Sequence, residues 1–156
     1  MMELDAVLRL LESLCPHADS VRSTSGIRGY YAYVQMHSTT VDGRWVVVQS
    51  SGGTIWLETE ESYGHFASTE DEDDAEFRET ATYFMALASA YVQGNFERTF
   101  SRLLKSPTLS FTVDGKTMTM RLEIGEAFRY LFGRHPGSDD HSARYGIPYR
   151  TPLGPM

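Results

Sequence analysis

The stretch from Thr108 to Ile124, TLSFTVDGKTMTMRLEI, alternates apolar and polar residues on both sides of a central Asp114-Gly115. Asp-Gly supplies the positive backbone φ that a two-residue type I′ turn needs, so the stretch predicts a β-hairpin. Pairing outward from the turn gives three opposed pairs, Val113 with Lys116, Phe111 with Met118 and Leu109 with Met120. One face of this hairpin is apolar, and an isolated hairpin is barely stable in water. The rest of the chain must therefore cover that face.

The same reading of periodicity and turn residues predicts the other elements. In chain order they are a helix over residues 3–14, a loop over 17–29, strands over 30–38, 44–50 and 54–60, a polar connection over 61–74, helices over 74–93 and 96–105, the hairpin, and a helix over 126–132. Two capping-box spacings, Ser68 with Asp71 and Thr69 with Glu72, precede the helix at 74–93.

We therefore predict an α+β fold with a mostly antiparallel sheet of about five strands, a three-stranded meander plus one hairpin, packed with helices. The predicted order is α-β-β-β-α-α-β-β-α. Residues 1–132 form a single domain in this prediction. Residues 133–156 are rich in proline and glycine and predict an extended or partly disordered tail.

The face assignment of the meander depends on its turns. Asp42-Gly43 and Gly52-Gly53 are both expected to form two-residue turns. The face shared with Val34 and Met36 would then carry Trp45, Val47, Gln49, Trp56 and Glu58. Both faces of the predicted meander are then largely apolar. Either helices cover both faces, or one aromatic-rich face binds a partner.

Composition excludes several classes of function. The net charge is −7, with seven acidic residues and a single base between residues 68 and 79, which argues against a nucleic-acid binder and favours a partner with a basic surface. No apolar run approaches the roughly 20 residues of a membrane span. Cys15 is the only cysteine, so no intramolecular disulfide forms, which fits a cytoplasmic location.

Motifs for catalysis or metal binding are not found. Ser50-Ser51-Gly52-Gly53 lies between two predicted strands and has no following helix or lysine, so it is a turn and no phosphate loop. Four metal-ligand residue types gather in the proline- and glycine-rich tail, His135, Asp139, Asp140 and His141, where no scaffold is predicted to hold them. We therefore predict no catalytic residue, no metal and no cofactor.

Aromatic and acidic residues are the remaining signal, because Tyr and Trp are enriched at protein interfaces. The predicted partner-binding residues are Tyr31, Tyr33, Trp45, Trp56 and Glu58 on the strands, and Glu70, Asp71, Glu72, Asp73 and Asp74 before the long helix. The competing interpretation of the acidic run is helix capping and solvation.

The leading hypothesis for function is a non-catalytic module that masks a partner protein, as an immunity protein or a secretion chaperone does, with a homodimer also considered. The predicted element order resembles that of type III secretion chaperones, and this resemblance implies protein binding. One alternative is a small enzyme or ligand-binding domain with a pocket beside His37, Tyr31 and Tyr33. Another is a structural subunit that docks through residues 133–156.

Overall fold

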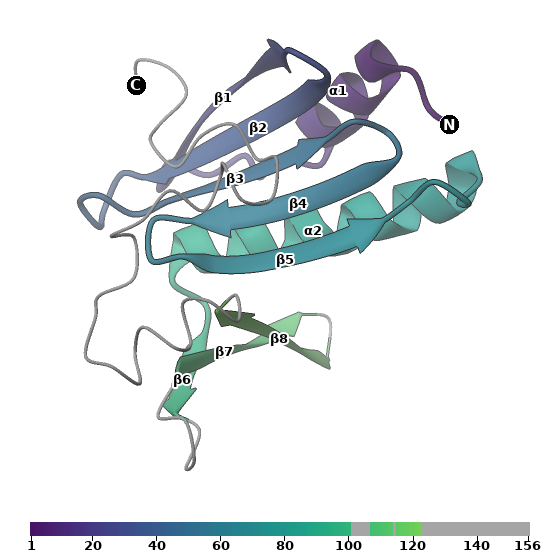
Figure 1. Ribbon diagram of the computed structural model, residues 1–156. Coiled ribbons are helices and arrows are strands. Elements are labelled where there is room, and N and C mark those ends of the chain that lie inside the picture. Colours follow the sequence, from purple (N-terminus) through teal and green to yellow (C-terminus); the bar gives the residue numbers. More distant parts are fainter. Residues whose placement is uncertain (101–106, 114, 123–156) are drawn as a thin grey trace.

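The computed structural model describes residues 1–100, 107–113 and 115–122, and shows two helices on one face of an antiparallel sheet (Figure 1). The elements are α1 (Leu4–Ser13), β1 (Val21–Arg28), β2 (Tyr31–Ser38), β3 (Trp45–Ser50), β4 (Thr54–Thr59), β5 (Tyr63–Ser68), α2 (Asp74–Gln93), β6 (Glu97–Phe100), β7 (Pro107–Val113) and β8 (Lys116–Leu122). The helix predicted at 126–132 and the tail predicted at 133–156 lie outside the described residues.

The sheet has the strand order β1-β2-β3-β4-β5-β8-β7-β6, and every neighbouring pair is antiparallel. Strands β1 to β5 form a continuous meander. Among the described residues, two residue pairs join β5 to β8, Tyr63 with Leu122 and Gly64 with Arg121. The sheet therefore consists of a five-stranded part and a three-stranded part with a narrow junction between them.

The α+β class, the antiparallel sheet, both helices at 3–14 and 74–93, and the three meander strands are confirmed. The hairpin at 108–124 is confirmed in register, since Val113 pairs with Lys116, Phe111 with Met118 and Leu109 with Met120. The predicted number of about five strands is wrong, because the described residues contain eight strands. The observed order of helices and strands therefore differs from the predicted order on which the resemblance to type III secretion chaperones was based.

The first missed strand is β1, which was predicted as a loop. On the side that faces the helices, β1 carries Ser23 and Ser25 at positions where apolar side chains were expected. The sequence therefore lacks the clear apolar–polar alternation that would indicate a strand. These small hydroxyl side chains suit a sheet edge that packs against α1. The Ser25 hydroxyl donates to Glu12 Oε1 on α1 at 2.7 Å, which satisfies the polar group.

The second missed strand is β5, which was predicted as a polar connection. Gly64, His65 and Ser68 interrupt its apolar pattern. Pairing with β4 nevertheless extends over five residues, and the His65 ring packs 4.9 Å from the ring of Phe84 on α2. A favourable place in the sheet therefore overrides weak local propensity.

The third missed strand is β6, where a helix was predicted at 96–105. The spacing of Phe96 and Phe100 suggested a helical face, but Glu97–Phe100 pairs with β7 and all four side chains are exposed. Phe96 instead stacks on Tyr91 of α2, with ring centroids 5.4 Å apart. Residues 101–106 lie outside the described residues.

The predicted register between β2 and β3 is also wrong. His37 pairs with Trp45, so the connection is longer than a two-residue turn. Ser38 explains the longer loop, because its Oγ accepts hydrogen bonds from the backbone N–H groups of Thr40 and Val41 at 3.2 and 2.9 Å. The shift places Val34 and Met36 on the face opposite Trp45. The turn at Gly52-Gly53 has two residues as predicted, since the N–H of Ser51 donates to the carbonyl of Thr54.

The hydrophobic core lies between the helices and the face of the sheet that they cover. Helix side chains in this core include Val7, Leu11, Phe77, Phe84 and Met85, and sheet side chains include Val34, Met36, Val46, Val48, Ile55 and Leu57. Most of these side chains are completely inaccessible to solvent. Neither helix in the described part of the chain is long and apolar enough to cross a membrane.

The start of α2 is fixed by Asp73. Its carboxylate accepts from the N–H of Glu76 at 2.9 Å, and the Glu76 carboxylate accepts from the N–H of Asp73 at 2.9 Å. This capping box replaces the two that were predicted. Thr69 instead links the end of β5 to the turn between β3 and β4, because its hydroxyl donates to the carbonyl of Gly52.

Replacing Asp73 by alanine should lower the free energy of unfolding by about 1 kcal/mol, because the N-terminal N–H groups of α2 lose their acceptor. Chemical denaturation measures this difference. Asp71→Ala is the control, since it removes an exposed acid from the same run without touching the cap. Equal losses in the two variants would show that Asp73 acts only as one of several surface charges.

Candidate functional site

The face of the sheet that points away from α1 and α2 is called the second face here. Its side chains come from β2 to β5 and are Tyr31, Tyr33, Gln35, His37, Trp45, Val47, Gln49, Trp56, Glu58 and Phe66. Within the described residues both helices lie on the other side (Figure 1). The second face therefore carries a group of aromatic and polar side chains that neither described helix covers.

A chain of aromatic rings crosses this face. The ring of Tyr31 lies 5.1 Å from that of Trp56, edge to face, and Trp56 lies 5.5 Å from Phe66. Trp56 in the middle is 8% exposed, whereas Phe66 at the β5 end is 50% exposed. Edge-to-face and tilted contacts of this kind stabilise aromatic pairs beyond their buried area. The rings thus form one packed surface from β2 to β5.

The predicted partner-binding residues on the strands differ in exposure. Trp45, Trp56 and Glu58 are buried, each less than a tenth exposed. Tyr31 and Tyr33 are half-buried. In this arrangement the two tyrosines offer surface to a partner, and the other three do not.

The predicted acidic residues lie in the connection from β5 to α2 and at the first residue of α2. Glu70, Asp71, Asp73 and Asp74 are exposed. Glu72 is half-buried and accepts a hydrogen bond from the Thr80 hydroxyl at 2.8 Å. Capping therefore occupies Asp73, and a helix contact occupies Glu72. The remaining carboxylates face solvent.

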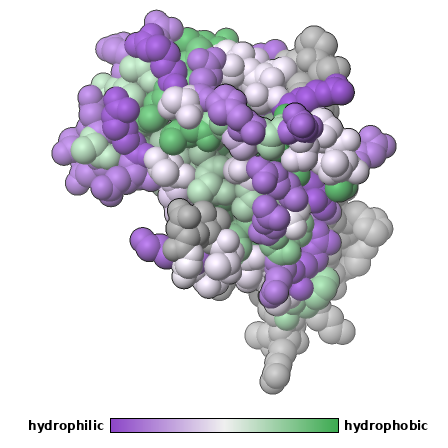
Figure 2. All heavy atoms as spheres, turned by 180° about the vertical axis from the view of Figure 1, so that it is seen from behind, coloured by the Kyte–Doolittle hydropathy of each residue, from purple (hydrophilic) through white to green (hydrophobic). Residues whose placement is uncertain are grey.

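The acidic connection and the exposed aromatic residues lie at the same end of the sheet. The turn from β1 to β2, the turn from β3 to β4 and the end of β5 all fall at this end, because neighbouring strands are antiparallel. Tyr30 in the first turn is 84% exposed. Seen from the helix side, the end where α2 begins is mainly hydrophilic (Figure 2). We call this surface the acidic end, consisting of Tyr30, Tyr31, Phe66, Glu70, Asp71 and Asp74.

His37 lies at the opposite end of β2, beside a polar hollow of about 260 Å³. The hollow is lined by Arg22, His37, Ser38, Thr39, Asp42, Gly43 and Arg44. His37 Nε2 is buried and has no hydrogen-bond partner among the described residues. Burial lowers the pKa of His37. The hollow contains none of the tyrosines that were predicted to line a pocket with this histidine.

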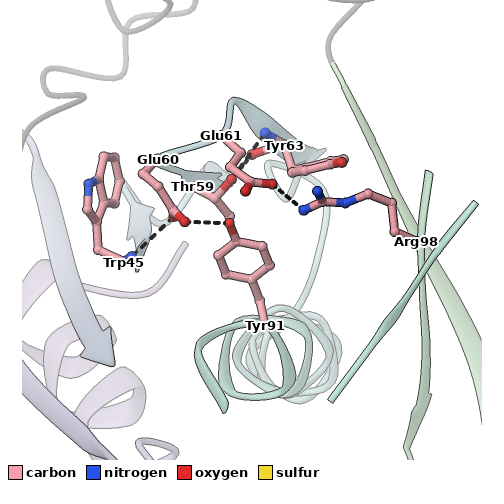
Figure 3. Close-up of polar contacts among 7 residues, drawn as sticks. All are labelled: Trp45, Thr59, Glu60, Glu61, Tyr63, Tyr91 and Arg98. Atoms are coloured by element: carbon pink, nitrogen blue, oxygen red, sulfur yellow. Dashed lines mark hydrogen bonds and ion pairs between the residues drawn. The ribbon is translucent and has the colours of Figure 1, made fainter. Parts of the chain in front are cut away.

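A cluster around Glu60 was not identified from the sequence. Glu60 follows β4, and its carboxylate accepts from the Tyr91 hydroxyl at 2.9 Å and from the N–H of Trp45 at 3.1 Å (Figure 3). Burial raises the pKa of Glu60, and the two hydrogen bonds oppose that shift. Burial and the Glu60 charge raise the pKa of Tyr91. No spacing in the sequence relates Glu60 to Tyr91, because one ends a strand and the other lies 31 residues further on a helix.

Two further contacts surround this cluster. The Arg44 guanidinium lies 5.7 Å from the ring centroid of Tyr91 and 5.3 Å from that of Phe96. Glu61 forms an ion pair with Arg98 of β6 (Figure 3). These contacts connect the five-stranded part to β6 at the narrow junction, so the cluster has a structural role.

Metal ligands are not assembled in the part of the chain that is described: it has no group of three or more His, Cys, Asp or Glu side chains able to hold a metal ion. His135, Asp139, Asp140 and His141 lie outside that part. The prediction that they bind no metal stays a prediction.

Replacing Glu60 by glutamine should change how stability depends on pH. The folded-state pKa of Glu60 is raised above the ordinary value of 4.5, so wild-type stability from this group is greatest below pH 4.5 and is lost as pH rises through the folded pKa. Glu60→Gln removes that loss, so its stability relative to wild type should increase with pH. Urea denaturation across a pH series measures the difference.

The control for this experiment is Glu97→Gln, which removes a carboxylate from an exposed position on β6. It should not reproduce the increase. Parallel stability curves for the wild type and Glu60→Gln would contradict a buried, destabilising charge at residue 60.

Comparison of the chain with protein-family models, with curated proteins and with solved structures finds no match in any of the three. The geometry of the described residues is therefore the basis for assigning a function.

Proposed function

We propose that this protein is a non-catalytic binding module that masks a partner protein, in the manner of an immunity protein or a secretion chaperone. The acidic end carries this proposal, because it combines exposed aromatic side chains with exposed carboxylates at one end of a rigid sheet. Aromatic residues that are large and partly exposed are the usual anchors of protein interfaces.

The two kinds of side chain would contribute differently to binding. Tyr30 and Phe66 retain apolar area that a partner can cover. Glu70, Asp71 and Asp74 supply negative charge beside that area, which raises the association rate with a positively charged surface. The partner that fits is therefore a protein with a basic surface and an apolar recess next to it.

The location of the aromatic chain supports the same assignment. Phe66 and Tyr31 are each held by Trp56, whose buried ring fixes both of them from β4. Side chains that are already ordered lose little conformational entropy when a partner binds.

A cytoplasmic location, expected from the single cysteine, stays a prediction.

The test is a binding measurement with the partner obtained by affinity capture from the native host. The combined variant Glu70→Gln, Asp71→Asn, Asp74→Asn should reduce the association rate at low salt on the order of tenfold and flatten its salt dependence. Asp73 is left intact because it caps α2. Stopped-flow or surface-based kinetics give both rates.

The matched control is Asp42→Asn, Glu79→Gln, Glu97→Gln, which removes three exposed acids elsewhere on the protein. A second variant, Tyr30→Ala with Phe66→Ala, should instead accelerate dissociation. The proposal fails if the acidic-end variant and the control variant bind the partner with the same kinetics and the aromatic variant dissociates like the wild type.

The polar hollow favours a second candidate function, a domain that binds a small anionic ligand. Arg22 and His37 provide nitrogen donors there, beside the Asp42 carboxylate. The guanidinium of Arg44, which also lines the hollow, packs against the rings of Tyr91 and Phe96. The third hypothesis, docking through residues 133–156, concerns residues outside the described ones and stays a prediction.

Inorganic phosphate and small carboxylates should raise the melting temperature if the hollow is such a site, and Arg22→Gln should abolish the rise because it removes the charged donor. Differential scanning fluorimetry measures the shift. Arg9→Gln, which removes an exposed base from α1, is the control. An equal shift in both variants, or none in the wild type, would rule out the hollow as an anion site.

A further inference from the structure

Strand β1 forms one edge of the sheet, and its exposed side is the feature that the proposed function does not use. All eight of its residues pair with β2. It is first in the strand order, so within the described residues no strand pairs with its other side (Figure 1). Ser23, Ser25 and Ile27 are exposed, and Ile27 is 44% exposed. An open strand edge of this length is a template for strand addition.

The register shows which backbone groups face outward. Arg28 and Tyr31 close the two-residue turn and form a hydrogen-bonded pair, so every second residue from Arg28 back to Arg22 bonds toward β2. The bond from the N–H of Thr39 to the carbonyl of Ser20 continues this alternation. The N–H and C=O groups of Ser23, Ser25 and Ile27 therefore point away from the sheet.

The central part of β1 lacks the residues that usually prevent a sheet edge from pairing with another strand. Edge strands are commonly protected by proline or by charged side chains. The five residues Ser23–Ile27 include no proline and no charge, and the nearest charges are Arg22 and Arg28 on either side. The strand itself therefore offers neither a proline nor a charged residue at its centre, where the nearest carboxylate is that of Glu12 on α1, which accepts from the Ser25 hydroxyl.

We propose that a second copy of this chain occupies the edge, with the two β1 strands antiparallel about a two-fold axis at Thr24. In this register Ser23 of each copy pairs with Ser25 of the other, so their outward N–H and C=O groups are satisfied. The N–H of Ile27 meets the carbonyl of Val21. The Val21 N–H donates to the carbonyl of Ala18 within its own copy, so the Val21–Ile27 pair at each end of the ladder makes one of its two possible hydrogen bonds.

The side chains agree with the same register. The exposed Ile27 side chain lies opposite the partly buried Val21 of the other copy, on the helix side of the sheet. Arg22 lies opposite Gly26, which has no side chain, and the two Thr24 side chains face each other. An axis at Ser25 would instead place Arg22 directly opposite Arg28, and like charges in that position are destabilising.

The dimer uses a different part of the sheet from the carboxylates of the acidic end, whereas Tyr30 of that end lies in the turn that follows β1. The dimer uses β1, whereas Phe66, Glu70 and Asp71 belong to β5 and the connection after it. These residues stay exposed in both copies, so one dimer would present two acidic ends.

Disulfide cross-linking tests the register directly. In a Cys15→Ser background, Thr24→Cys should form a covalent dimer with oxidised glutathione, because directly opposed residues in a non-hydrogen-bonded pair have Cα atoms about 4.5 Å apart. Ser25→Cys is the control. In the proposed register its diagonal separation is roughly 7–8 Å, beyond the reach of a disulfide.

Light scattering on the full chain provides a measurement that needs no cysteine. The wild type should be a dimer, Thr24→Val should remain one, and Thr24→Lys should raise the dimer dissociation constant by about fivefold because two ammonium groups then oppose each other. A monomeric wild type at all concentrations, or cross-linking of Ser25→Cys in preference to Thr24→Cys, would overturn the proposal. Preferential cross-linking at residue 24 supports it even if the lysine variant does not fold.

Discussion

The packing of α2 across one face of the sheet is the contact on which the rest of the structure depends. Phe77, Phe84 and Met85 on the helix are buried against the valine, isoleucine and leucine side chains of β3 and β4. Truncating side chains of this kind typically destabilises a protein by about 2–5 kcal/mol each, so the loss of any one of these contacts would remove a large part of a typical domain's stability. The same alternation places Tyr31, Trp56 and Phe66 on the second face.

The packing of α2 also determines where the acidic residues lie. Because β5 ends beside the turn from β3 to β4 and Thr69 bonds to Gly52 and Gly53, the short connection to α2 must cross this end of the sheet. The carboxylates of Glu70, Asp71 and Asp74 thus lie beside Phe66 as a consequence of chain topology. Asp73 is held there by the helix itself, since it caps the first turn.

The narrow junction has a different kind of stabilisation. Where two residue pairs join β5 to β8, polar and aromatic contacts add to the backbone pairing. Glu60 brings together β3 and α2, because it accepts hydrogen bonds from Trp45 and Tyr91. Arg98 then links β6 to the turn after β4 through Glu61. The three-stranded part is therefore attached by specific contacts near one point.

The sequence alone was sufficient to predict the elements whose apolar residues recur with a clear strand or helix periodicity. The alternation around Asp114-Gly115 predicted the hairpin register, and the apolar stripe from Phe77 to Val92 predicted α2. It was insufficient for β1 and β5, whose serine, glycine and histidine residues are tolerated because a neighbouring strand provides the hydrogen bonds. It was also insufficient for β6, where the spacing of Phe96 and Phe100 suggested a helix although Glu97–Phe100 pairs with β7. The β2–β3 register could not be obtained either, since it depends on how Ser38 folds the loop.

The candidate site was predicted in its residue types but not in its arrangement. Tyr31 and the acidic run were both named, yet their common location at one end of the sheet required β5, which the sequence did not show. The burial of Trp45 and Trp56 also follows from cross-strand neighbours that periodicity alone does not give. The Glu60 cluster joins residues from separate elements and has no local signal.

The central claim is that the acidic end is the surface that holds a partner protein. Hydrogen–deuterium exchange on the free protein and on its complex with the captured partner tests it most directly. The account predicts slowed exchange in the turn at residues 28–31 and across residues 66–74. Unchanged exchange in both segments, with protection instead around residues 37–44, would contradict it and would point to the polar hollow.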